Sequence, residues 1–454
     1  MFLEENDDYV RRRIEAEAST SKYWFQVSLI WAQLDGILRG HDFARTEGGW
    51  ASAAAPLSRI GLLFINALVD LSTVVGKPFL SDDKAAWTSA EVAAFSAHGT
   101  HCSAIVKLSA DFSELWTAHN TWTGFFTMLR TAKLYDLPIP GVVRKSAFAG
   151  YFGTISSNDD FFVLSSGLVV QETTNSVFPP RSGMYSARAV LTWTRTVVAN
   201  RLATDGKSWT EWFSIENSGT INNQWMVVDY NKFVPGQSLV KGTLWVLEQL
   251  PGYIESADMT GYLQDSHWPS FNQPVFPTVR NLSGNDEMAA RFGLEYSYDL
   301  NPRAKIFRRD APRVQTRDQL RAFVRYNDWQ NDPFSAAGYG GAEEPRSPEN
   351  AIASRADLIP SGSAFPGQAA LRGPHGNTDG KLVGWQDVLH MRFAFVVGPT
   401  ADDQPPFAWV GEWGSLPHEG QPTLFNFSWE LVTFANIISA EPGPSVIFTE
   451  AVVV

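Results

Sequence analysis

The order of hydrophobic patterns along the chain constrains its fold more than any other feature of the sequence. Apolar residues at helical spacing occupy residues 7–40 and 57–75, so the first hundred residues are predicted to be helical. From Cys102 onward, short apolar runs bounded by Asp, Ser, Asn and Gly predict strands, with a further helix near Ala187 to Leu202. Helices and strands therefore occur in blocks. Such blocks favour antiparallel sheets covered by helices over a doubly wound parallel sheet.

The predicted strands fall on short segments spread over the middle of the chain. They are the runs CSAIVKL, ELWTAHN, AFAGYFGTI and FFVLSSGLVVQETT, followed by Gln224 to Tyr230, Thr243 to Leu250 and Gly252 to Asp258. Residues 332–381 are rich in Gly, Pro, Ser and Asn instead. We expect this irregular stretch to wrap over the outside of the fold.

One window, Ile60 to Gly76, is apolar enough to suggest a membrane segment. It is shorter than the roughly 20 residues that a membrane-spanning helix needs, and it contains Asn66 and Asp70. A buried helix is therefore expected, and no transmembrane segment. The first 19 residues are acidic and then basic without an apolar core, unlike a signal or transit peptide. The chain as given reads as cytosolic, or as secreted or periplasmic if a leader was removed.

Composition excludes several classes of protein and site. The chain has 36 Lys and Arg against 48 Asp and Glu, a net charge of −12, which argues against a nucleic-acid partner. Its single cysteine, Cys102, excludes an intrachain disulfide framework and a Cys-rich zinc or iron–sulfur site. His98 and His101 crowd that cysteine, but no third well-spaced ligand is evident. We expect neither a metal nor a cofactor.

Common catalytic signatures are missing from the sequence. There is no G-x-S-x-G nucleophile elbow and no H-E-x-x-H zinc motif. The segment Gly206-Lys207-Ser208 is not a P-loop, because Arg201 stands where that motif needs glycine. Serine hydrolases of the elbow type, P-loop enzymes and zincins are therefore excluded.

The position of Cys102 gives it a possible chemical role. A lone cysteine is more often a small buried apolar residue than a nucleophile. This one opens the first predicted strand, directly after the polar segment Thr88 to Thr100. A cysteine that opens a strand after a cleavable linker is typical of N-terminal-nucleophile hydrolases. Cleavage before it frees an α-amine with a pKa of about 7.7–8.0, which can take the proton of the thiol.

A series of collinear motifs carries a family resemblance. They are LIWAQLDGIL, HCSAIVKL, TAHNTW, GTISSNDDFFVLSSGLVVQETTN, VANRLATDGKSW, NSGTINNQWMVVDY, SYDLNPRAKIFRRD, RYNDWQNDPFS, ENAIASRADL and GPTADDQPPFAW. In these motifs the chain resembles the phospholipase B-like family, which includes lysosomal proteins of animals and their amoebal relatives. The resemblance runs from about Leu29 to Pro417.

The resemblance implies an α+β fold, a four-layer αββα sandwich of the N-terminal-nucleophile type with antiparallel sheets. It implies a proenzyme that cuts itself between His101 and Cys102. Residues 1–101 would then be the small chain plus linker and residues 102–454 the catalytic chain, and the two fragments would stay associated. The matching site residues are Cys102 as nucleophile, with His119, Trp122, Thr174, Asn272 and Arg303.

The chemistry of these residue types is consistent with acyl transfer. An antiparallel hairpin would bring His119 beside Cys102. Asn272 can donate its amide to a developing oxyanion, and Arg303 can hold the thiolate or bind a substrate carboxylate. The pairs Asp159-Asp160 and Asn222-Asn223 are explained either by turn chemistry or as buried support of the site.

These features favour a self-processing hydrolase that forms an acyl-thioester on Cys102. Its substrate would be a small acyl amide or a lipid-type ester, with the amide narrowly favoured. The alternative, from another class, is a catalytically weak relative that binds an apolar ligand or a partner protein in the same pocket. Two fragments that break before Cys102 would favour the enzyme, and a permanently intact chain would favour the binding protein.

Overall fold

The N-terminal region consists of helices, as the apolar spacing predicts. The computed structural model describes residues 1–48, 55–74, 101–178, 184–293, 296–336, 346–361 and 372–434. The first helices are α1 (Phe2–Glu17), α2 (Lys22–Thr46), α3 (Arg59–Asn66) and α4 (Leu68–Val74). The polar segment Thr88 to Thr100 lies outside the described residues, as does His98.

The apolar window that begins at Ile60 forms α3 and α4, which are separated at Ala67. Leu62, Leu63 and Leu71 bury their side chains in a cluster with residues of α1 and α2. The expectation of a buried helix is confirmed, with two short helices in place of one. Among the described residues, no helix has both the length and the apolar character to span a bilayer.

The first sheet carries the strand that Cys102 opens. Its strands lie in the order β10-β1-β2-β12-β13-β16, with β11 also paired to β2, and every neighbouring pair is antiparallel. Their bounds are β1 (His101–Leu108), β2 (Leu115–Gly124), β10 (His267–Ser270), β11 (His375–Asn377), β12 (Asp379–Gly384), β13 (Phe393–Val397) and β16 (Glu430–Val432). The strand β1 thus lies inside the sheet, between β2 and β10.

The second sheet is a meander in which each strand pairs with the next along the chain. Its antiparallel strands are β3 (Thr131–Asp136), β4 (Lys145–Gly150), β5 (Phe161–Leu164), β6 (Leu168–Thr174), β7 (Asn223–Asp229), β8 (Leu244–Leu250) and β9 (Tyr253–Asp258). A separate pair joins β14 (Phe407–Ala408) to β15 (Leu424–Phe425). The strands predicted at residues 224–230, 243–250 and 252–258 are β7, β8 and β9.

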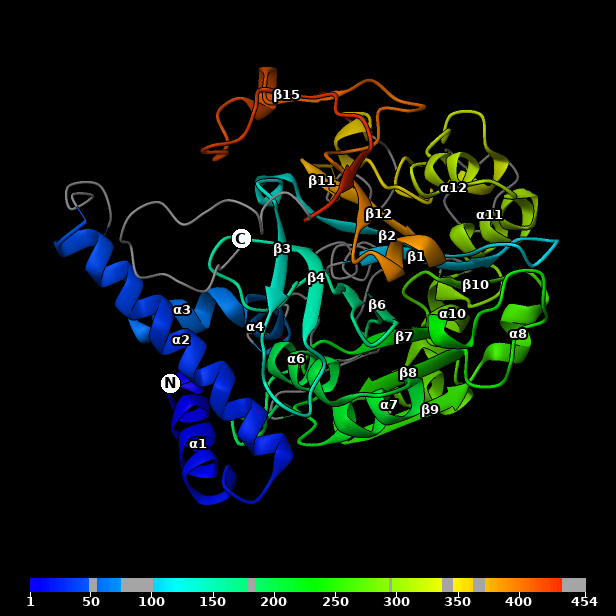
Figure 1. Ribbon diagram of the computed structural model, residues 1–454. Helices are drawn as coiled ribbons and strands as arrows, with labels where there is room; N and C mark the ends of the chain where they lie inside the picture. Colours follow the sequence, from blue (N-terminus) through cyan, green and yellow to red (C-terminus); the bar gives the residue numbers. More distant parts are fainter. Residues whose placement is uncertain are drawn as a thin grey trace.

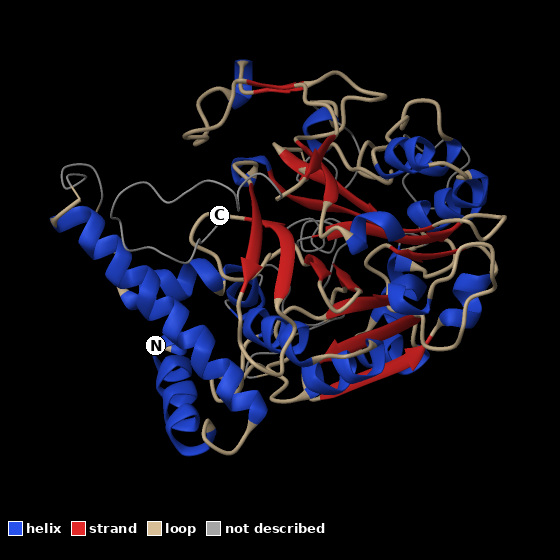
Figure 2. Cartoon of the chain, viewed as in Figure 1, coloured by secondary structure: helices blue, strands red, loops and turns tan. Residues whose placement is uncertain are grey.

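The two large sheets share one apolar core. Alternate residues of β1, namely Ala104, Val106 and Leu108, belong to the same buried cluster as Val169 of β6 and Val228 of β7. Because side chains alternate between the faces of a strand, Cys102 is directed to this same face, toward the second sheet. Figure 2 shows the strands gathered in the middle of the molecule with helices around them.

Helices cover the outer face of each sheet. On the first sheet, α11 (Pro302–Asp310) and α12 (Arg317–Val324) pack on Ile105, Trp116 and Ala118. On the second, α6 (Thr192–Leu202) and α7 (Gly206–Ser214) cover Phe162 and Trp225 (Figure 1). The shorter helices are α8 (Thr260–Gln264), α9 (Pro277–Leu282), α10 (Asn285–Phe292) and α14 (Trp385–Leu389). The predicted α+β class with antiparallel sheets is confirmed.

Residues 337–345 and 362–371 lie outside the described residues, and for much of the rest of 332–381 the expectation that the stretch wraps over the outside is wrong. Ala351, Ile352 and Ala353 are fully buried, although they lie outside regular helices and strands. The stretch ends in β11 and in the first half of β12, where Lys381 lies buried inside the first sheet. The sequence hides this strand because the first positions of β12 carry charged side chains and glycine in place of apolar residues.

Candidate active site

Both backbone groups of Cys102 are held by side chains from distant parts of the chain. The chain runs continuously through His101 and Cys102 into β1, and the cysteine side chain is buried. The Cys102 N–H donates to Oδ1 of Asn272 at 3.3 Å, and the Cys102 carbonyl oxygen accepts from Nη1 of Arg303 at 2.8 Å. The peptide unit on each side of the thiol is therefore fixed in place.

His119 lies beside the thiol because β1 and β2 form a hairpin. In the register of this pair Cys102 faces Thr121, and Ala104 faces His119. Cys102 Sγ, a ring nitrogen of His119 and a carboxylate oxygen of Glu172 all lie within 4.8 Å of one another. All three side chains are buried, and Glu172 comes from β6 of the opposite sheet. The spacing along the hairpin predicts that His119 lies beside Cys102. The sequence analysis did not predict that Glu172 lies there as well.

The protonation of His119 follows from its hydrogen bond. Its Nε2 lies 2.9 Å from the backbone carbonyl oxygen of Glu172, which can only accept, so Nε2 carries the proton. Nδ1 has no hydrogen-bond partner among the described residues. Burial, with the charge of Lys381, lowers the pKa of His119 well below its usual value. Neutral His119 therefore offers the lone pair of Nδ1 as a base.

The thiol itself is not activated in the uncut chain. Burial raises the pKa of Cys102 well above its usual value, and the neighbouring Glu172 adds to the effect. Burial, together with Asp160 and Asp159, also raises the pKa of Glu172 well above its usual value. Burial therefore favours the protonated form of both groups. A base must remove the thiol proton before the sulfur can attack.

Asn272 connects the cysteine to the end of β6. It lies two residues after the end of β10 and has a left-handed backbone with φ of 64°. While Oδ1 accepts from Cys102, Nδ2 donates to the Thr174 carbonyl at 2.6 Å, and the Thr174 hydroxyl donates to Oε2 of Glu172 at 3.4 Å. One hydrogen of Nδ2 is thus used in holding Thr174. The second hydrogen is the one that an oxyanion would need.

Arg303 and Trp122 stack behind the strand that carries the thiol. The helix α11 starts with Pro302, and the Asn301 side chain accepts from the Arg303 N–H at 2.9 Å, which fixes the first turn. The guanidinium carbon of Arg303 lies 4.4 Å from the centre of the Trp122 ring. Burial lowers the pKa of Arg303 to about 9. The sequence predicts that Arg303 holds the thiolate or binds a substrate carboxylate, and in the structure its guanidinium contacts the carbonyl oxygen of Cys102.

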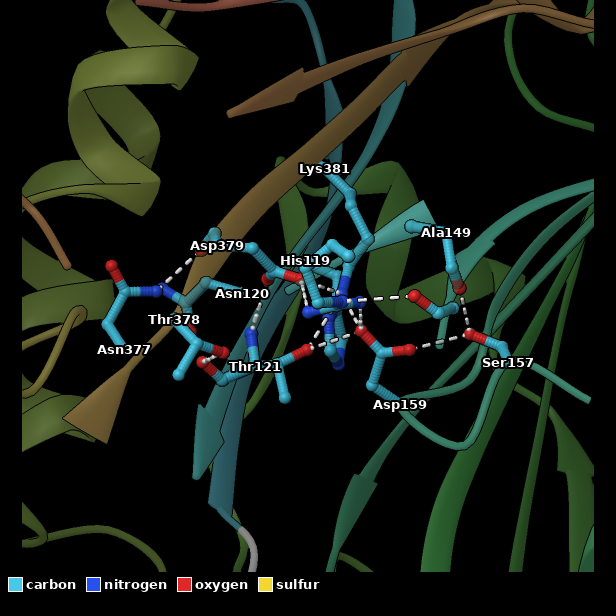
Figure 3. A network of polar contacts seen from close by, with 12 residues as sticks. His119, Asn120, Thr121, Ala149, Ser157, Asp159, Asn377, Thr378, Asp379 and Lys381 are labelled. Atoms are coloured by element: carbon cyan, nitrogen blue, oxygen red, sulfur yellow. Dashed lines mark hydrogen bonds and ion pairs between the residues drawn. The ribbon is translucent and has the colours of Figure 1, made fainter. Parts of the chain in front are cut away.

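A buried ionic network next to the site was found only in the structure (Figure 3). Lys381 donates to Thr121 Oγ1 at 2.7 Å, to Asp159 Oδ2 at 2.7 Å and to Asp379 Oδ2 at 2.8 Å. Arg130 binds the same two carboxylates. Two cations thus face two anions, and the pKa of Asp159 is held far below its usual value by Arg130 and Lys381 despite its burial.

This network fixes the strand next to the nucleophile, since Asp379 Oδ1 accepts from the backbone N–H of Thr121 at 2.9 Å. The sequence singled out Asp159 and its neighbour Asp160, and for Asp159 the reading as buried support agrees with these contacts. Lys381, Asp379 and Arg130 gave no local signal, because isolated charges are also typical of solvated loops.

Among the described residues, one group offers the donors of a metal site, namely Cys102, His119 and Glu172. The crowding of His98 and His101 around Cys102 cannot be followed further, because His98 and the side chain of His101 lie outside what the structure describes.

Comparison with known proteins assigns the chain to a family. The family model for phospholipase B matches residues 1–432. Phospholipase B-like protein A of Dictyostelium discoideum is 36% identical over 97% of this chain and 78% of its own length. Phospholipase B-like protein C of the same organism is 38% identical over 96% of this chain and 75% of its own length. With a buried cysteine at the start of an inner strand and relatives that match it almost end to end, the chain belongs to the phospholipase B-like family.

Proposed function

We propose that the protein is a self-processing N-terminal-nucleophile hydrolase in which Cys102 is the nucleophile of both self-cleavage and turnover. One observation carries the proposal. Cys102 is the second residue of the inner strand β1, with its N–H bound by Asn272, its carbonyl bound by Arg303 and its thiol within 4.8 Å of His119. The two sheets with helices on both outer faces fit the four-layer αββα sandwich of that class, which we assign to this chain.

The groups around Cys102 are suited to cut the chain at the His101–Cys102 peptide. In the uncut chain the Cys102 nitrogen is an amide and is not a base, so Nδ1 of His119 takes the thiol proton. The thiolate attacks the His101 carbonyl carbon, the C–N bond breaks, and the proton moves from His119 to the departing nitrogen. Water then hydrolyses the thioester. The products are a carboxylate on His101 and a free α-amine on Cys102.

The freed α-amine changes the chemistry of the same sulfur. With an ordinary pKa of about 7.7–8.0, it can remove the thiol proton near neutral pH without help from the imidazole. The sulfur then attacks an acyl carbonyl and releases the amine or alcohol, and water hydrolyses the acyl-thioester. A second hydrogen on Nδ2 of Asn272 is available to the oxyanion of each step. Uncut chain is therefore expected to be inactive.

The test of this mechanism is the mass of the purified protein. Wild-type chain should yield two fragments that meet between His101 and Cys102, and Cys102→Ala should remain one chain of about 50 kDa. Cys102→Ser keeps a weaker nucleophile at the same position and should cut more slowly. Cleavage of Cys102→Ala at the same bond would refute the nucleophile. Wild-type chain that never cuts would favour the second candidate, a protein that binds an apolar ligand or a partner, which a buried unactivated thiol also suits.

We propose a fatty-acyl amide or ester as the substrate, with the amide narrowly favoured. The family name supports lipid chemistry, and Trp268 stands close in sequence to Asn272. Burial of each methylene contributes about 0.8 kcal/mol, so each added pair of carbons should raise kcat/KM roughly tenfold until the pocket is full. Mature enzyme assayed on N-acyl amino acids and lysophospholipids of graded chain length tests this. Rates that do not change with chain length would refute the lipid-acyl substrate and leave the nucleophile standing.

A further inference from the structure

The cluster around Cys102 has the donors of a metal centre as well as those of a nucleophile. A thiol, an imidazole and a carboxyl converge from β1, β2 and β6, with donor atoms within 4.8 Å of one another. Sulfur and imidazole together suit zinc and similar divalent transition metals, which are bound at about 2.0–2.3 Å. An ion at the centre of such a triangle lies at most about 2.8 Å from each donor, so shifts of about 0.5–0.8 Å close the bonds.

Among the described residues, one ring nitrogen of His119 is bound and the other is open to a ligand. Nε2 of His119 donates to the backbone carbonyl of Glu172, and this outer hydrogen bond leaves the lone pair on Nδ1. Metal-bound histidines are held by the same kind of bond from their second ring nitrogen. Nδ1 is fully buried and has no hydrogen-bond partner among the described residues. A buried nitrogen of this kind costs free energy until something occupies its lone pair.

The charges around the cluster are balanced among themselves, so they do not oppose the binding of one divalent cation. Lys381 and Arg130 are already balanced by Asp159 and Asp379, which both of them contact. A dication bound by one thiolate and one carboxylate adds no net charge to the buried site. The charges that oppose a buried ion are therefore compensated within the cluster itself.

We propose that this chain binds one zinc-class divalent cation between Cys102 Sγ, Nδ1 of His119 and the Glu172 carboxylate, and that the bound ion silences the nucleophile. As the bonds form, the thiol and carboxyl protons pass to the solvent. The lone pairs of sulfur and Nδ1, which self-cleavage needs, are then occupied by the metal. The inhibitory half of this inference rests on the proposed function, whereas the binding half does not.

Titration of the purified protein with Co²⁺ as a spectroscopic probe tests the binding half, because cut and uncut protein both contain Cys102, His119 and Glu172. Wild-type protein should bind one Co²⁺ and show a thiolate-to-cobalt absorption band together with the visible bands of a tetrahedral site, and Zn²⁺ should displace it. Cys102→Ala should lack the thiolate band, and Glu172→Gln should bind about tenfold more weakly or worse. His418→Ala, which removes a half-buried histidine of a loop outside the cluster, is the matched control and should bind as wild type does.

Circular dichroism shows whether each variant is folded. If a variant is unfolded, the titration of wild-type protein alone tests whether the metal site exists. The absence of a thiolate band in wild-type protein, or equal affinity in wild type and Cys102→Ala, would overturn the site. For the inhibitory half, Zn²⁺ present during synthesis of the chain should stop fragment formation, and a chelator added afterwards should restore it. Binding without any slowing of cleavage would overturn the inhibition alone. A chain that binds Co²⁺ but never cuts would overturn the proposed function and leave the metal site in place.

Discussion

At the scale of single residues, the side chain of Asn272 connects two parts of the candidate active site. Its amide binds Cys102 at one end and Thr174 at the other, so it joins the nucleophile to the strand that carries Glu172. Its left-handed backbone, with φ of 64°, is a conformation that Asn tolerates better than most residues do. The side chain and the backbone at this position therefore have separable effects.

Removing the Asn272 side chain should lower kcat by about 10²–10³ with little change in KM, because one oxyanion donor is lost. Asn272→Ala should also lower the stability of the folded protein by about 1–2 kcal/mol, because alanine is strained in the left-handed conformation. Asn272→Gly should not, because glycine adopts that conformation without strain. The two variants should therefore have equal kcat on cleaved protein but different melting temperatures. An Asn272→Gly enzyme with unchanged kcat would show that Asn272 has a structural role and is not an oxyanion donor.

At the scale of elements, the contact between α4 and α6 shows how the N-terminal helices are attached. The helix α6 has no side-chain cap of its own, and Asp70 of α4 accepts from the N–H groups of Thr192 and Trp193 at 2.8 and 3.3 Å. The Thr220 hydroxyl donates to the same carboxylate. Burial nevertheless raises the pKa of Asp70 from 3.8 to about 6.

Asp70 should therefore make stability fall as pH rises between about 4 and 6. In that range the folded state binds the Asp70 proton more tightly than the unfolded chain does, so the stabilisation present at low pH is lost by pH 7. Two pKa units correspond to about 3 kcal/mol. Asp70→Asn keeps an accepting oxygen and does not titrate. The unfolding free energy of Asp70→Asn in urea, relative to that of wild type, should rise by up to about 3 kcal/mol from pH 4 to pH 7. An equal pH dependence in both proteins would contradict the raised pKa of Asp70.

At the scale of the whole molecule, the helices α1 to α4 share a core with residues that follow Cys102. Side chains of α1 to α4 bury themselves in one cluster with Val190, Trp193 and Val197. Polar bonds reinforce it. The Asn6 side chain donates to the carbonyls of Ala187 and Ala189 at 2.8 and 2.9 Å, and Asn66 bonds the backbone at Gly153 and Ile155.

The two fragments should consequently stay together after cleavage before Cys102. The apolar cluster and these hydrogen bonds do not depend on the peptide at that point, so cutting it removes none of them. Size-exclusion chromatography of cleaved protein should give one peak that contains both fragments, and concentrated urea should resolve two. Separation of the fragments in native buffer would show that this interface is too weak to hold them.

Local pattern alone determined the α+β class, most strand positions and the neighbourhood of Cys102 and His119. These features follow from residues close in sequence, because periodicity reports burial of one face and a hairpin pairs adjacent strands. The family resemblance, and not the pattern, pointed to Asn272 and Arg303, which lie 170 and 201 residues from the cysteine they bind.

Only the tertiary structure decided which charges are buried and what they contact. Glu172 meets Cys102 because the faces of two different sheets pack together, and Lys381 meets Asp159 across that same interface. In the sequence each of these residues looks like a solvated charge, since its compensating partner lies far along the chain. Burial of a charge is favourable only once that partner is in place, so no local pattern can report it.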